Sequence, residues 1–176
     1  MSIAPPARAI LLTGTVGSGK TSVAVEIGEL LEAGEASYAL VDLDWVAWLR
    51  PAPTSVATVH SVLVENLGLI WPTFREAGVE LLVLTRCIDD RDQLDALRGA
   101  LPGVELFVVR LTAPQPLIEQ RLQARDCGVQ LAEHLAETAR FAARGEQAAL
   151  EDAVVENGAR PLSEVAAEVL AAASWR

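Results

Sequence analysis

The segment GTVGSGKT, residues 14–21, carries residue types and a spacing that can bind phosphate. It fits the pattern G-x-x-x-x-G-K-[ST]. Glycines allow a tight turn in which successive backbone N–H groups converge on phosphate oxygens. A helix that begins at this turn adds its amino-terminal amides and its dipole. We therefore expect residues 14–22 to bind a nucleotide: Gly14, Thr15, Val16, Gly17, Ser18, Gly19, Lys20, Thr21 and Ser22.

Lys20 is the single lysine among fourteen Lys and Arg residues. Arginine supplies every other side-chain cation, so lysine occurs only where phosphate chemistry favours a compact point charge. We expect the Lys20 ammonium to lie against the β- and γ-phosphates and to act in catalysis. The Thr21 hydroxyl would complete a Mg²⁺ shell. The alternative is an ordinary glycine turn between a strand and a helix.

The segment VDLDW places Asp42 and Asp44 at the carboxyl end of a predicted strand. In an open parallel sheet, that edge faces the ligand crevice. A carboxylate there can accept the proton of an attacking hydroxyl or hold water on Mg²⁺. We expect at least one of the two to be catalytic. The alternative is that one of them caps the following helix.

Three arginines are candidates for binding anionic groups. Arg121 and Arg125 lie four residues apart in EQRLQARD, on one face of a helix end. Arg86 ends a predicted strand, again at the carboxyl edge. The alternative for all three is a salt bridge with a neighbouring acid, such as Asp126 or Asp89.

The remaining candidates surround the aspartates. Three tryptophans, Trp45, Trp48 and Trp71, either line an acceptor pocket with an apolar component or pack in the core. Arg75 is a further candidate for contact with the acceptor. His60 stands alone in a helical pattern, and we interpret it as structural.

Apolar runs alternate with helical periodicity along the chain. Five strands separated by helices predict an α/β domain with a mainly parallel sheet, and we expect 1–176 to form a single domain. A proline interrupts the second helical pattern at position 72 and predicts a kink or break. A surface loop is expected over 50–55. The predicted strands are 8–14, 37–44, 79–87, 104–111 and 151–157, and the predicted helices are 19–34, 54–78, 89–103, 114–126, 131–150 and 160–173.

Composition excludes several classes of function. The 176 residues carry a net charge of −10, which disfavours nucleic acid as a partner. No run of eighteen apolar residues is present, so a membrane span is not expected. The amino-terminal residues lack a signal-peptide pattern, and Cys87 and Cys127 lack metal-ligand spacing. We expect a cytoplasmic protein with unpaired thiols, either monomer or homodimer.

The motifs together resemble the small P-loop kinases, the group with shikimate kinase, gluconate kinase, adenylylsulfate kinase and chloramphenicol phosphotransferase. The resemblance rests on the glycine loop, VDLD, LIEQRLQAR and the closing VVENGARPLSEVAAEVL, in that order and spacing. It implies a P-loop NTPase fold, a three-layer α/β/α sandwich with a five-stranded parallel sheet of order 2-3-1-4-5, of nucleoside-kinase type. It also implies ATP, Mg²⁺ and a small-molecule acceptor with a hydroxyl group.

The resemblance also assigns roles to particular residues. Asp44 would orient the acceptor hydroxyl and Asp42 would act as base or metal ligand, or the two roles are exchanged. A short lid over 121–130 would bring arginines onto adenine or the transferring phosphoryl group. By the same resemblance, four residues would contact the nucleotide: Arg121, Arg125, Asn157 and Gly158. It also implies that Asp44 and Arg86 contact the acceptor, and the sequence adds Trp45, Trp48 and Arg75 as further acceptor candidates.

The sequence departs from individual relatives and leaves the acceptor open. Shikimate kinase carries a glycine triplet after its third strand, where this chain reads VLTRCIDD. A GTPase would need an Asn-Lys-x-Asp motif, which cannot occur because Lys20 is the only lysine. The alternative function is a nucleotide-binding regulatory P-loop ATPase, which would need neither Asp42 nor Asp44.

Overall fold

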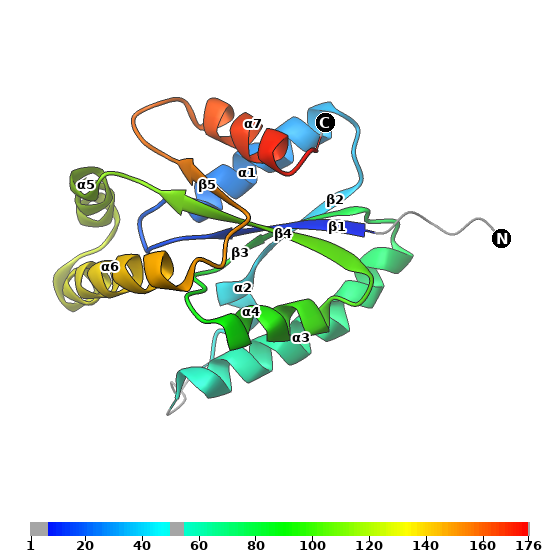
Figure 1. Ribbon diagram of the computed structural model, residues 1–176, viewed down its shortest axis with the longest axis horizontal. Helices are drawn as coiled ribbons and strands as arrows, with labels where there is room; N and C mark the ends of the chain where they lie inside the picture. The colour runs from blue at the N-terminus through cyan, green and yellow to red at the C-terminus, as the bar shows by residue number, and fades with distance from the viewer. Residues whose placement is uncertain (1–6, 50–54, 176) are drawn as a thin grey trace.

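A parallel sheet of five strands forms the centre of the computed structural model, which describes residues 7–49 and 55–175 (Figure 1). The strand order is β2-β3-β1-β4-β5, and every neighbouring pair is parallel. This confirms the predicted order 2-3-1-4-5. The strands are β1 (Ala7–Thr13), β2 (Tyr38–Asp42), β3 (Leu81–Thr85), β4 (Val104–Thr112) and β5 (Ala153–Glu156).

Helices cover both faces of the sheet and produce the predicted three layers (Figure 1). On one face lie α1 and α7, which pack against each other. On the other lie α3 and α4, with α6 beside them toward β4 and β5. The helices are α1 (Lys20–Ala33), α2 (Leu43–Val46), α3 (Val56–Glu76), α4 (Arg91–Ala100), α5 (Gln115–Arg125), α6 (Gly128–Ala148) and α7 (Leu162–Ala172).

Alternate side chains of β1 enter two separate apolar cores. Ile10 and Leu12 pack with α1 and α7, whereas Ala9 and Leu11 pack with α3 and α4. All four are fully buried. A strand shows this pattern when helices cover both of its faces, and its sequence then reads as a continuous apolar run.

Two predicted elements differ from the structure. The strand predicted over 37–44 ends at Asp42, because the Asp42 side chain caps a short helix that begins at Leu43. The predicted break at Pro72 is absent, and α3 is continuous from Val56 to Glu76. Trp71 before the proline and Phe74 after it both pack on the same core, which holds the last turn in line. Most of the loop predicted over 50–55 lies outside the described residues.

The carboxyl edge of the sheet gathers most of the predicted site residues. The chain leaves β1 at Gly14, β2 at Asp42 and β3 at Arg86, and α1, α2 and α4 begin from this edge. The helix α3 also begins near it and runs back to the start of β3. None of the helices in the described part of the chain combines the length and hydropathy that crossing a membrane requires.

Candidate active site

The phosphate-binding loop between β1 and α1 depends on glycine for its shape. Gly14, Gly17 and Gly19 have φ angles of 135°, 83° and 92°, which L side chains rarely adopt. A Cβ on Gly14 would lie 2.3 Å from the carbonyl oxygen of Leu111, and one on Gly19 would lie 2.2 Å from Nδ2 of Asn157. Backbone conformation and close packing therefore both favour glycine at these positions of the loop.

The backbone carbonyls of residues 14–18 accept hydrogen bonds from side chains of several other elements. Lys20 Nζ donates to Gly14 O at 3.1 Å and to Thr15 O at 3.0 Å. Cys87 Sγ also donates to Gly14 O, at 3.0 Å. The other three donors are Thr138 to Val16 O at 3.2 Å, Arg121 to Gly17 O at 3.4 Å and Asn157 to Ser18 O at 2.8 Å.

The amino end of α1 is suited to an anion. Gly19 occupies the N-cap position, and no side chain in the described part of the chain caps this helix. The first N–H groups of a helix have no partner within it, so they are available to phosphate oxygens. The loop and this helix end therefore fit the phosphates of a nucleotide.

We expect Gly19→Ala to lower nucleotide affinity by tenfold or more and to destabilise the fold by about 1–3 kcal/mol. The new methyl group would displace Asn157 and force an unfavourable φ. Nucleotide titration and urea unfolding measure the two effects. Gly99→Ala is the matched control, because a Cβ at Gly99 meets nothing within 4 Å. Equal affinity in the two variants would contradict the prediction.

The two aspartates after β2 have different surroundings. Asp42 caps α2, because its Oδ1 accepts from the Asp44 backbone N at 3.1 Å, as one alternative predicted. Its Oδ2 also accepts from Thr21 Oγ1 at 3.1 Å. Asp44 instead pairs with Arg86, with 2.9 Å between Oδ1 and Nη1. Thr21 and Asp42 together present oxygen ligands of the kind that Mg²⁺ prefers alongside phosphate oxygens and water.

The two arginines at the end of α5 also differ. Arg121 connects the loop to the chain after β5, because it donates to Gly17 O and to the carbonyls of Asn157 and Gly158, at 3.2 and 3.4 Å. Burial lowers the pKa of its guanidinium. The structure thus brings Arg121, Asn157 and Gly158 together beside the loop.

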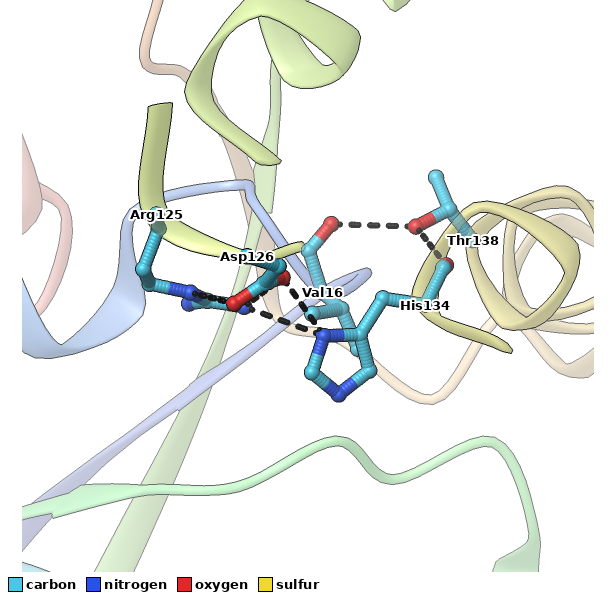
Figure 2. A network of polar contacts seen from close by, with 5 residues as sticks. All are labelled: Val16, Arg125, Asp126, His134 and Thr138. Carbon is cyan, nitrogen blue, oxygen red and sulfur yellow. Dashed lines mark hydrogen bonds and ion pairs between the residues drawn. The ribbon is translucent and has the colours of Figure 1, made fainter. Parts of the chain in front are cut away.

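Arg125 takes part in a different network (Figure 2). Its guanidinium binds Asp126 through two hydrogen bonds, of 2.9 and 3.0 Å, and His134 Nδ1 lies 2.7 Å from the same carboxylate. Thr138, one turn along α6 from His134, contacts Val16 O. The salt bridge considered as an alternative for Arg125 is therefore present. The predicted lid range 121–130 contains the end of α5, two linking residues and the start of α6.

Acid should weaken this network. The Arg125 guanidinium, and then His134, lower the pKa of Asp126 from its ordinary 3.8 to about 2. A carboxylate with a lowered pKa stabilises the fold above its unfolded pKa and loses that contribution as the pH falls toward the folded one. Between pH 5 and 2 we expect Asp126→Asn to show a smaller loss of stability than wild type. Thermal unfolding across this range measures it, and parallel curves would contradict it.

The tryptophans next to the aspartates are exposed. Trp45 and Trp48 are 70% and 57% exposed and stack on each other, with 4.9 Å between ring centroids. Trp71 is buried in the core. Arg75 lies at the opposite edge of the sheet, where it donates to Val79 O at 2.8 Å and lies over the Trp71 ring. We therefore do not include Arg75 in the site.

Several residues of the site gave no signal in the sequence. Thr138 and Cys87 reach the loop from α6 and from the end of β3, and neither belongs to a recognisable motif. A mostly apolar cavity of about 160 Å³ also adjoins the loop, between β4, α5 and α6. Its walls include Gly14, Ile118 and Phe141.

Comparison with known proteins identifies the fold. No protein-family model and no curated protein matches the sequence. A gluconokinase from Sinorhizobium meliloti is 23% identical, with a TM-score of 0.65 over 97% of this chain and 93% of that one. The tunicamycin resistance protein of Deinococcus radiodurans is 19% identical, with a TM-score of 0.68 over 97% of both chains. The APS kinase of Mycobacterium tuberculosis is 20% identical, with a TM-score of 0.61 over 97% and 99%.

The chain has the fold of the small P-loop kinases. The likeness extends over nearly the whole length of both proteins in each comparison. It confirms the three-layer architecture that the resemblance in the sequence implied. The small P-loop kinase fold places the glycine loop, the aspartates and Arg121 at one edge of the sheet.

Proposed function

We propose that this protein is a Mg²⁺- and ATP-dependent kinase that transfers the γ-phosphoryl group to a hydroxyl of a small molecule. The observation that carries the proposal is the Thr21–Asp42 hydrogen bond of 3.1 Å. It joins the first turn of α1, directly after the phosphate-binding loop, to the acidic end of β2, so a phosphate donor and a hydroxyl acceptor can meet there. The kinase fold of the structural neighbours supports the same reaction class.

The chain's own residues would perform the transfer mostly by positioning and by charge neutralisation. The loop amides and Lys20 would hold the phosphates. Thr21 and Asp42 would hold Mg²⁺, which supplies further neutralisation of the phosphate charge when bound. Asp44 would orient and deprotonate the acceptor hydroxyl. Arg121 already lies against the loop, whereas Arg125 would have to leave Asp126 to reach a phosphate.

The acceptor side is a small molecule in this proposal, and neither nucleic acid nor a membrane is a partner. The exposed Trp45–Trp48 pair adjoins Asp44 and would contact an apolar part of the acceptor. The protein would act in the cytoplasm as a monomer or homodimer. A regulatory ATPase is the second candidate, because the loop alone would serve it.

ADP release with Mg²⁺ and ATP, measured across a panel of hydroxylated metabolites and antibiotics, tests the function. We expect one chemical class to stimulate release well above the rate without acceptor. ATP binding with no stimulation by any compound would favour the regulatory ATPase. The background rate is set by a Lys20→Ala preparation assayed in parallel.

A further inference from the structure

The apolar cavity beside the start of the phosphate-binding loop has the size of a small ring. Its volume is about 160 Å³, and it lies at the carboxyl end of β4, where Figure 1 shows α5 and α6. An apolar cavity of about 150 Å³ holds a benzene molecule, so this one suits a single six-membered ring. Side chains from four parts of the fold form its apolar wall, namely Ile88, Leu111, Ile118 and Phe141.

Polar side chains of the wall are already bonded within the chain. Thr13 Oγ1 donates to Ile88 O at 3.2 Å and accepts from Ile88 N at 2.9 Å. Thr138 Oγ1 donates to Val16 O at 3.2 Å (Figure 2). Water in a cavity needs about two to four polar partners, so this wall favours an apolar occupant over water. Two further hydroxyls of the wall belong to Thr15 and Thr112.

The charge at the wall is balanced. Arg110 is the charged side chain that lines the cavity in the described part of the chain, and it is paired with Glu151. Its Nε and Nη2 lie 2.9 and 2.8 Å from the same carboxylate oxygen. The two side chains are only 20% and 12% exposed, so water and salt screen the pair weakly. Because the pair carries no net charge, the cavity favours a neutral occupant over an ion.

The chain after β3 connects the cavity to the proposed base. Arg86 is paired with Asp44, and two residues later Ile88 lines the cavity. Between them, Cys87 Sγ donates to the first carbonyl of the loop at 3.0 Å. The residues proposed for the nucleotide instead contact the carbonyls of residues 17 and 18. An acceptor whose hydroxyl meets Asp44 would therefore extend its other groups toward the cavity.

We propose that this cavity binds an uncharged ring of the acceptor, so that the substrate is an alcohol with an aromatic or alicyclic group. This inference rests on the proposed kinase function. An open-chain polyol would lose water from its hydroxyls at a mostly apolar wall, whereas a hydrocarbon ring would not. Phe141 adds an aromatic side chain against which a ring can stack or pack edge to face.

Isoleucine methyl signals test ring binding without any reaction. Full-length protein labelled at isoleucine methyl groups, with an ATP analogue and Mg²⁺, is titrated with benzyl alcohol, cyclohexylmethanol and glycerol. We expect a ring alcohol to shift the signals of Ile88 and Ile118, which line the cavity, and glycerol to leave them unchanged. Ile10 and Ile27 lie in the core under α1 and α7 and are internal controls. Spectra of Ile88→Val and Ile118→Val assign the two signals.

A variant that fills the cavity tests its role in turnover. Ala113 lines the cavity, and Ala113→Leu would occupy part of the space that the ring needs. We expect the methyl shifts to be lost and KM for a ring acceptor to rise about tenfold or more, because the ring is left in water. Unchanged affinity for the ATP analogue shows that the variant is folded. Ala33→Leu adds the same side chain at an exposed position of α1 and is the matched control.

The exposed Trp45–Trp48 pair is a second apolar surface near Asp44. Trp45 does not line the cavity, so Trp45→Ala should retain the shifts of Ile88 and Ile118. Loss of these shifts in Trp45→Ala but not in Ala113→Leu would assign the ring to the tryptophans and overturn the inference.

The remaining outcomes separate this inference from the function on which it rests. A polyol that is phosphorylated with the same KM in wild type and Ala113→Leu, while no ring alcohol is a substrate, overturns the ring site and leaves the kinase intact. A ring alcohol that shifts Ile88 and Ile118, with no compound releasing ADP, supports the site and counts against the kinase. Ring alcohols that shift neither signal, or that shift Ile10 and Ile27 equally, overturn the inference.

Discussion

Replacement of Lys20 by alanine should lower kcat/KM for phosphoryl transfer by at least about a thousandfold. The ammonium is the one lysine charge in the chain, and it is fixed at the loop by two carbonyls. In the proposed reaction it would stabilise the charge that develops between the β- and γ-phosphates. Steady-state kinetics with the acceptor found in the panel measures the effect.

Two further variants make the result interpretable. Lys20→Arg keeps the charge but replaces a compact ammonium with a planar fork, and we expect most of the activity to be lost. Arg98→Ala removes an exposed cation outside the loop and should leave kcat/KM at the wild-type value. Activity of Lys20→Ala within tenfold of wild type would refute the role of the loop in transfer.

The second large effect is expected at Asp44. Asp44→Asn keeps the shape and an oxygen for the contact with Arg86 but removes the proposed base, so kcat should fall by a factor of about 10² to 10⁴. ATP affinity should not change, because the loop is intact. Isothermal titration with an ATP analogue and turnover with the acceptor measure the two quantities separately.

Asp95→Asn is the matched control for Asp44, because Asp95 also pairs with an arginine but lies on the exposed face of α4. If Asp44→Asn turned over at the wild-type rate, the acceptor site would lie elsewhere on the edge of the sheet. The apolar cavity beside the loop would then be the next place to examine.

The phosphate-binding loop and the parallel α/β class were predictable from sequence because their causes are local, whereas the strand order came from the resemblance to the small P-loop kinases. Three glycines adopt φ angles that other residues avoid, and a lysine and a threonine follow at fixed positions. Alternation of apolar strands with helices then predicts a parallel sheet. Neither prediction requires knowledge of a contact between distant segments of the chain.

Other parts of the site depend on contacts between distant segments. Asn157 binds Ser18 across 139 positions, and no spacing rule predicts that bond. Arg125 was expected at the phosphates, but a carboxylate next to it and a histidine on the following helix hold it instead. His60 was interpreted as structural, and it is buried near the start of α3.

Because the chain has a single lysine, the phosphate-binding loop can be labelled selectively at that residue. Its ε-amine is the only one in the chain, and it lies at the first position of α1. An acylating or reductively methylating reagent would therefore modify one side-chain amine, inside the loop itself. If bound nucleotide protects Lys20, the modified fraction falls as nucleotide is added. Mass spectrometry of the one peptide that contains Lys20 then measures how much of the loop is occupied by nucleotide. Labelling of Lys20 in the natural sequence would thus measure nucleotide binding, with no engineered tag or reporter.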